Sequence, residues 1–177
     1  WSSDVCSSDL DHEGPRADLK AYVANYSRNV VFQSENGQAT PVHERGHVMM
    51  MHSDDVVVKY AAFDELGRTD KSARSFDVSQ LTSVTSDSNV QGRYSFHLHR
   101  TGVTDQAHPA IVEGNAVWGS PGWGFVHHDS NAILSNNAAY DVFGAAFVAE
   151  TGNETGRWDH NIAIKSLGMN HSSKVVD

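Results

Sequence analysis

The sequence predicts an all-β protein, a right-handed parallel β-helix of the pectate-lyase type. Three observations predict it: a segment that repeats after about two dozen residues, many short strand-like runs, and asparagines that recur once per repeat. Stacked-repeat proteins have periods of this length, because each repeat buries its apolar face only against its neighbours.

The repeat joins residues 111–128 to residues 133–150, at an offset of 133 − 111 = 22 residues. A leucine-rich repeat is the main alternative at this period, but its Leu-x-x-Leu-x-Leu pattern is absent. Small residues, short apolar runs and corner-forming Asn and Gly instead favour one coil of a β-helix. The identical pairs are Ile111/Ile133, Asn115/Asn137, Ala116/Ala138, Gly122/Gly144, Phe125/Phe147 and Val126/Val148.

Strand-like runs follow one another along the chain, and most are followed by Gly, Asn, Asp or Ser, which is turn chemistry. Helical periodicity is limited to a short turn at residues 17–26, and the Ser-, Asp- and Thr-rich residues 69–89 are expected to form a loop or insertion beside the solenoid. The predicted strands are 29–33, 47–52, 56–60, 94–99, 110–112, 124–127, 132–134, 145–148 and 161–164.

Three asparagines are expected at equivalent corners of successive coils. Asn115 and Asn137 are one repeat apart, and Asn161 follows at 161 − 137 = 24 residues. Asn tolerates left-handed backbone and can form a hydrogen-bonded ladder when coils stack. We therefore expect a structural role for all three.

Residues 1–10 resemble the translation of a sequencing-library adapter and are set aside from fold reasoning. Residues 11–177 are then expected to form one β-helix domain. The chain ends without a polar capping segment, so the sequence predicts an internal piece of a longer protein and a monomer within a larger multidomain chain.

Composition narrows the range of partners. The net charge is −9, or −9 + 2 = −7 without Asp4 and Asp9, which argues against nucleic acid as a partner. The adapter-like leader also holds the only cysteine, Cys6, so no thiol or disulfide chemistry remains. No stretch approaches the roughly 20 apolar residues that a membrane span needs.

The densest polar cluster is the segment 92–102, Gly-Arg-Tyr-Ser-Phe-His-Leu-His-Arg-Thr-Gly. In a strand, Phe96 and Leu98 point to one face and His97 and His99 to the other. If the two hydrophobic residues fill the core, both imidazoles are expected to face solvent side by side. Ordinary exposed strand histidines are the alternative interpretation.

The repeat adds further groups to this surface. It places His127 on Ala149 and His128 on Glu150, with roughly 4.8 Å between neighbouring strands. We expect His97, His99, His127 and Glu150 to be catalytic, through proton transfer by the imidazoles and the carboxylate, and to converge within about 8 Å. Because His127 and His128 lie on opposite faces of a regular strand, only one of them can join this surface.

Two basic side chains, Arg93 and Arg100, together with His128, are expected to bind an anionic group of the substrate. No cofactor is predicted. A divalent metal on His97 and His99 is the alternative, since His-x-His places both rings on one face of a strand. A zinc site needs a third ligand, and the sequence does not identify one.

Several motifs together resemble the β-helix region of the cell-migration-inducing and transmembrane hyaluronidases, the fibrocystin-like proteins and their bacterial secreted relatives, which share an upstream G8 domain. The resemblance runs from Arg28 to Ile164. Its most specific element is Gly-Arg-Tyr-Pro-(Ile/Leu)-His-Phe-His, here with Ser95, Phe96 and Leu98 as departures. His127 matches a family histidine, whereas His128 stands where a glycine is usual. The motifs are 28–31, 46–49, 92–99, 144–150 and 154–156.

This resemblance implies a secreted or cell-surface protein and, in the animal hyaluronidase branch, glycan cleavage. We expect part of a depolymerase for an acidic polysaccharide, either a glycoside hydrolase or a lyase. The alternative is a non-catalytic module that binds glycan or spaces domains in a large surface protein. Fold similarity alone does not decide between them.

Overall fold

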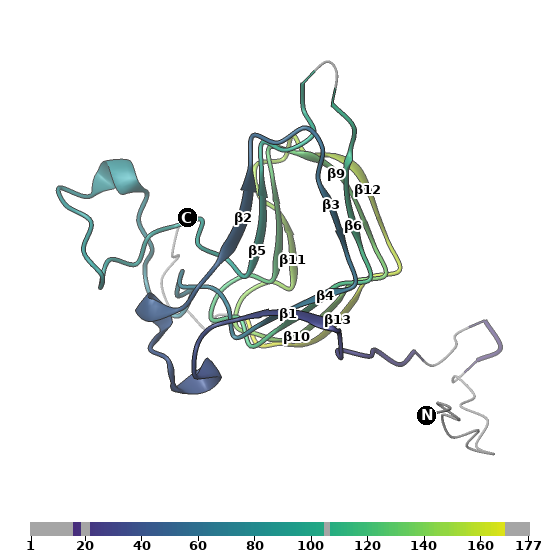
Figure 1. Cartoon of the computed structure of the whole chain (residues 1–177), viewed down its shortest axis with the longest axis horizontal. Coiled ribbons are helices and arrows are strands. Elements are labelled where there is room, and N and C mark those ends of the chain that lie inside the picture. Colours follow the sequence, from purple (N-terminus) through teal and green to yellow (C-terminus); the bar gives the residue numbers. More distant parts are fainter. Residues whose placement is uncertain (1–15, 19–21, 105–106, 169–177) are drawn as a thin grey trace.

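A computed structural model describes residues 16–18, 22–104 and 107–168, and in these residues short parallel strands stack coil upon coil (Figure 1). The adapter-like residues 1–10 lie outside the described residues. The elements are β1 Val30–Gln33, η1 Gly37–Ala39, η2 Val42–Glu44, β2 Val48–Met51, β3 Val57–Lys59, β4 Ala61–Asp64, η3 Val78–Gln80, β5 Phe96–His99, β6 Ala110–Glu113, β7 Ala116–Trp118, β8 Phe125–His128, β9 Asn131–Ser135, β10 Ala138–Val142, β11 Phe147–Ala149, β12 Thr155–Asp159 and β13 Ile162–Ser166.

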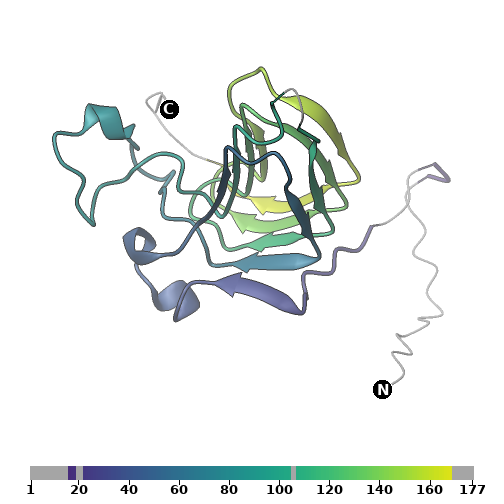
Figure 2. The ribbon, with the colours of Figure 1, turned by 45° about the horizontal axis from the view of Figure 1, so that its top comes forward.

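The strands form three parallel sheets, in the orders β1-β4-β7-β10-β13, β2-β5-β8-β11 and β3-β6-β9-β12. Each coil therefore contributes one strand to each side of a triangular solenoid, as Figures 1 and 2 show. The all-β parallel β-helix predicted from the sequence is confirmed. The predicted 22-residue repeat is the pairing of β8 with β11, which sets Phe125 beside Phe147 and His127 beside Ala149.

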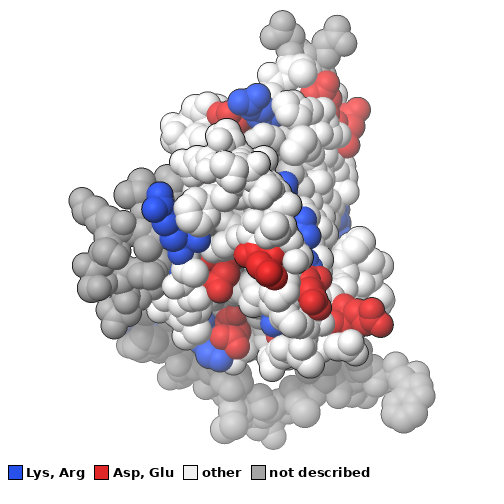
Figure 3. Space-filling view, turned by 90° about the vertical axis from the view of Figure 1, so that its left-hand side faces the viewer, with Lys and Arg blue, Asp and Glu red and all other residues white. Residues whose placement is uncertain are grey.

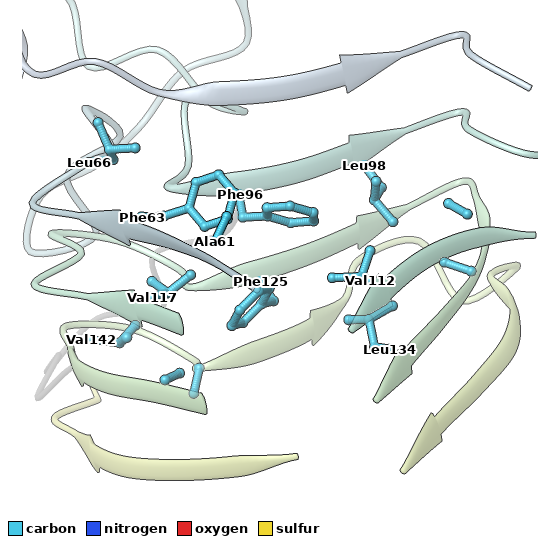
Figure 4. Packing of buried hydrophobic residues seen from close by; sticks show 14 of the residues in the cluster. Ala61, Phe63, Leu66, Phe96, Leu98, Val112, Val117, Phe125, Leu134 and Val142 are labelled. Carbon is cyan, nitrogen blue, oxygen red and sulfur yellow. The ribbon is translucent and has the colours of Figure 1, made fainter. Parts of the chain in front are cut away.

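Stacked apolar side chains fill the interior because every coil places the same kind of residue at the same position. Phe96, Phe125 and Phe147 form a continuous column on the β2-β5-β8-β11 sheet, and Phe63 from β4 meets Phe96 edge-on, with ring centroids 5.0 to 5.3 Å apart. Figure 4 shows three of these rings in the interior, with Leu98 and Val112 beside them. Phe96 and Leu98 have no exposed surface, as the predicted strand alternation requires.

The asparagine ladder at one corner is also confirmed. The Asn115 Nδ2 donates to Asn137 Oδ1 at 3.2 Å, and the Asn137 Nδ2 donates to Asn161 Oδ1 at 3.0 Å. The same amides donate to backbone carbonyls of Val58 and Val112. Asn115 and Asn137 thus each tie their own coil to both neighbours, and Asn161 bonds to the preceding coil.

Four strands were not predicted: β4, β7, β10 and β12. They are rich in Ala or contain Gly and Asp, which have low strand propensity, and pairing with the preceding coil stabilises them instead. The helical turn predicted at 17–26 is absent from residues 22–26, which are irregular, and residues 19–21 lie outside the described part.

The long connection between β4 and β5 projects from the solenoid, at the left of Figure 1. It contains η3, whose first turn is closed by a capping box between Asp77 and Gln80. The Asn89 side chain fixes its base, accepting from the backbone N–H of Asp70 and donating to its carbonyl. Within the described residues, no helix has the length and hydrophobicity needed to cross a bilayer.

Candidate active site on the β2-β5-β8-β11 sheet

Three imidazoles, those of His97, His99 and His128, meet on the outer face of the β2-β5-β8-β11 sheet; they are called the histidine cluster below. Parallel pairing sets His99 beside His128 in register. One nitrogen atom from each ring lies within 4.8 Å of the others. The His99 and His128 rings stack at 4.5 Å, and His97 meets both edge-on.

A carboxylate completes the group. Glu150 follows β11, one coil after His128, and its Oε2 lies 2.7 Å from His128 Nδ1 and 3.9 Å from His97 Nε2. The first distance is a charge-assisted hydrogen bond, and the second is too long to be one. The predicted convergence therefore holds for His97, His99 and Glu150.

The placement predicted for His127 is wrong. The register pairs His127 with Leu98, so its side chain lies on the inner side of the strand with Phe125 and only 2% of its surface is exposed. Its Nε2 donates to the Ser130 carbonyl at 2.8 Å, and its Nδ1 accepts from Trp158 Nε1 at 3.3 Å. Both ring nitrogens are thus used in fixing a corner. His128 takes the outer position that was predicted for His127.

His97 is also less accessible than predicted, because only 2% of it is exposed. The chain turns back at Gly92, and the Tyr94 ring packs at 5.3 Å from His97. Tyr94 in turn stacks on Trp123, over which the Lys71 ammonium lies at 3.9 Å. This aromatic stack forms the buried side of the cluster and leaves His99 and His128 as its more open members.

The tautomer of His97 is set by its surroundings. Its Nδ1 lies 2.9 Å from the Gly92 carbonyl, which can only accept, so Nδ1 carries the proton and Nε2 carries the lone pair. Burial lowers the pKa of His97 to about 4, although the bond to Gly92 acts in the opposite direction. His97 is therefore neutral at pH 7 and can act as a base or a ligand, not as an acid.

The two predicted arginines lie on either side of this cluster along the chain. Arg100 takes a left-handed conformation at the corner after β5, and its Nε lies 3.4 Å from Asp129 Oδ2. Arg93 precedes β5 and lines a pocket beneath the insertion together with Arg68. Burial, and then the like charge of Arg68, lower the pKa of Arg93. Figure 3 views this side of the molecule, where basic and acidic groups are interspersed among uncharged surface.

Sequence reasoning missed the contributions of Gly92, Arg68, Asp129 and Glu154. The Gly92 carbonyl and Arg68 act through contacts that depend on how the chain turns before β5. Asp129 directly follows the His127-His128 pair, and an acid after two histidines was the available signal. The pKa of Asp129 is lowered chiefly by its hydrogen bond from Asn153, so it stays ionised beside Arg100.

Glu154 holds the turn after β11 and should make stability depend on pH. Burial would raise its pKa, but hydrogen bonds from the Thr151 hydroxyl and from the backbone of Thr151 and Asp129 outweigh this and lower it to about 2. A depressed carboxyl pKa stabilises the fold above the ordinary value of 4.5, and this contribution is lost as the pH falls toward 2. The difference in unfolding midpoint between wild type and Glu154→Gln at pH 7 should therefore shrink progressively as the pH falls from 4.5 toward 2. A constant difference would contradict this account.

A family model described as CEMIP beta-helix matches residues 45–174, which include every strand from β2 to β13. No curated protein and no solved structure matches the chain. The matched region contains the histidine cluster and Glu150.

Proposed function

Because the chain belongs to the CEMIP β-helix family, we propose that it is part of a secreted or cell-surface protein that cleaves an acidic polysaccharide. The observation that carries the proposal is the meeting of three imidazoles and one carboxylate on an outer sheet face. Groups that exchange protons with one sugar linkage must all lie within hydrogen-bonding distance of that linkage.

Glycan cleavage requires proton exchange at the leaving oxygen and at a second position. In hydrolysis the second proton comes from water that adds to the anomeric carbon; in a lyase it comes from the carbon beside the uronate carboxyl. We assign the exchange to Glu150, with the neutral His97 Nε2 beside it at 3.9 Å. A hydrolase of the usual kind employs two carboxylates, and we assign the second to Asp129, the residue that follows His128.

Binding of an anionic chain is assigned to the arginines. Arg93 and Arg68 offer two guanidinium groups at one end of β5, and Arg100 offers a third at the other end. Guanidinium groups pair with carboxylates through two parallel hydrogen bonds, which suits uronate residues. The neighbouring positive charges of Arg68 and Arg93 would be relieved by such a ligand.

The test is release of sugar ends from a panel of hyaluronan, chondroitin, pectate and alginate, with starch as the neutral comparison. The full chain should cleave at least one acidic glycan, and the double variant His97→Ala/His99→Ala should lose that activity. His160→Asn is the matched control, because His160 is exposed at the β12-β13 corner and Asn accepts its left-handed backbone. Ultraviolet absorbance of an unsaturated uronate separates a lyase from a hydrolase.

Two outcomes would contradict the proposal. Equal release of sugar ends by wild type and by the double variant would show that the histidine cluster does not catalyse the cleavage. Binding of acidic glycan without any cleavage would support the alternative, a non-catalytic glycan-binding or structural module.

A further inference from the structure

The geometry points to a divalent transition-metal site formed by His97, His99 and His128, with Glu150 orienting the third ligand. This inference deepens the proposed function. Only the use of the metal in catalysis depends on that function, whereas metal binding is argued from the geometry of the cluster alone.

The first support is an unsatisfied lone pair on His97. Its Nε2 is buried and has no hydrogen-bond partner among the described residues. A buried acceptor without a partner is costly, and native proteins rarely keep one without a reason. The opposite nitrogen donates to the Gly92 carbonyl, which is the usual way a protein fixes the ring of a metal-binding histidine.

The second support is the distance between the candidate ligand atoms, which lie within 4.8 Å of one another. Tetrahedral Zn²⁺ with bonds of about 2.0–2.1 Å places its ligand nitrogens about 3.4 Å apart. The ligand nitrogens must therefore approach one another by up to about 1.4 Å. His99 and His128 are only partly buried, so they have room to turn toward the fixed His97.

The third support is the carboxylate behind His128. Glu150 Oε2 accepts from the His128 Nδ1, which leaves Nε2 of that ring with its lone pair. Carboxylate–histidine pairs of this kind orient metal ligands and raise their basicity. The cluster thus presents a buried, oriented His97, an oriented His128, and His99 between them.

A ligand set of three imidazoles indicates which class of metal ion the site would bind. Neutral imidazole suits Zn²⁺, Co²⁺, Ni²⁺ and Cu²⁺, whereas Ca²⁺ and Mg²⁺ prefer oxygen ligands. Three protein ligands also leave a coordination position for water, as in catalytic zinc sites. A metal at this position would supply an activated water beside Glu150.

The experiment is titration of the chelator-treated full chain with Co²⁺ and with Zn²⁺. We expect one equivalent to bind, with visible Co²⁺ absorption of the intensity typical of a four-coordinate ion. His99→Ala and His128→Ala should each raise the Kd about 100-fold or more, Glu150→Gln should raise it about 10- to 100-fold, and His160→Asn should leave it unchanged. His97→Gln tests the buried ligand with a side chain that still donates to the Gly92 carbonyl, and circular dichroism verifies the fold of each variant.

Absence of Co²⁺ absorption in folded wild type, or equal Kd values for wild type and His99→Ala, would overturn the inference. These results are independent of glycan cleavage. Metal binding without glycan cleavage would support the metal site and contradict the proposed function. Glycan cleavage by a chelator-treated chain that binds no metal would support the proposed function and contradict the metal site.

Discussion

Asn137→Leu is expected to lower the free energy of unfolding by about 3–5 kcal/mol, which is a large part of the stability of a domain. Asn137 is fully buried. Its amide donates to the Val112 carbonyl and to Asn161, and its oxygen accepts from the backbone and the side chain of Asn115. Leucine has a similar volume but leaves these partners buried without hydrogen bonds, each at about 1–3 kcal/mol.

Urea unfolding at neutral pH measures this loss. Asn161→Leu is the graded control: Asn161 stands at the end of the ladder and is half-buried, so water can replace its lost hydrogen bonds and the decrease should be smaller. Equal stability of wild type and Asn137→Leu would show that the ladder does not hold the coils together.

Glu150→Gln is expected to lower kcat for glycan cleavage by about 10²- to 10⁴-fold, the usual contribution of a general acid or base. Glutamine keeps the size of the side chain and can still bond to His128 Nδ1, but it cannot exchange a proton. KM should change little, because the arginines assigned to binding remain. The pH dependence of kcat should also lose the limb that reports this carboxyl group.

The matched control is Glu113→Gln, on the β3-β6-β9-β12 sheet. Glu113 pairs with Lys59 at 2.7 Å, and the variant removes one carboxylate from a different side of the solenoid. Its kcat should equal that of wild type. A Glu150→Gln chain with unchanged kcat would assign the proton exchange to another group.

Much of the fold could be read from the chain because a solenoid repeats its own environment. The recurrence of Phe125 as Phe147 and of Asn115 as Asn137 reflects a shared column and a shared corner, so local sequence carries tertiary information. The strands rich in Ala or interrupted by Gly, such as β7 and β12, could not be read in this way. Strands of three to five residues have no stability of their own, and they exist here because the adjacent coil offers a ready partner.

The candidate site was likewise predicted only in part from the sequence. Strand alternation placed the side chains of His97 and His99 on one face of their strand, and it showed that those of His127 and His128 lie on opposite faces of theirs. The same alternation, counted from Phe125 in the core, places His127 inward and His128 outward, so the expectation for His127 conflicted with the strand pattern itself. What alternation could not show is the register between β5 and β8, which pairs Leu98 with His127 and brings His128 beside His99.

The sequence by itself determined the parallel β-helix, the stacked phenylalanines, the asparagine corner and the outward direction of His97 and His99. Only the tertiary structure decided that the register sets His128 beside His99, and that His97 is covered by Tyr94 with its tautomer fixed by Gly92. The physical reason is that side-chain alternation is a property of one strand, whereas register and burial arise from contacts between coils and loops far apart in the chain.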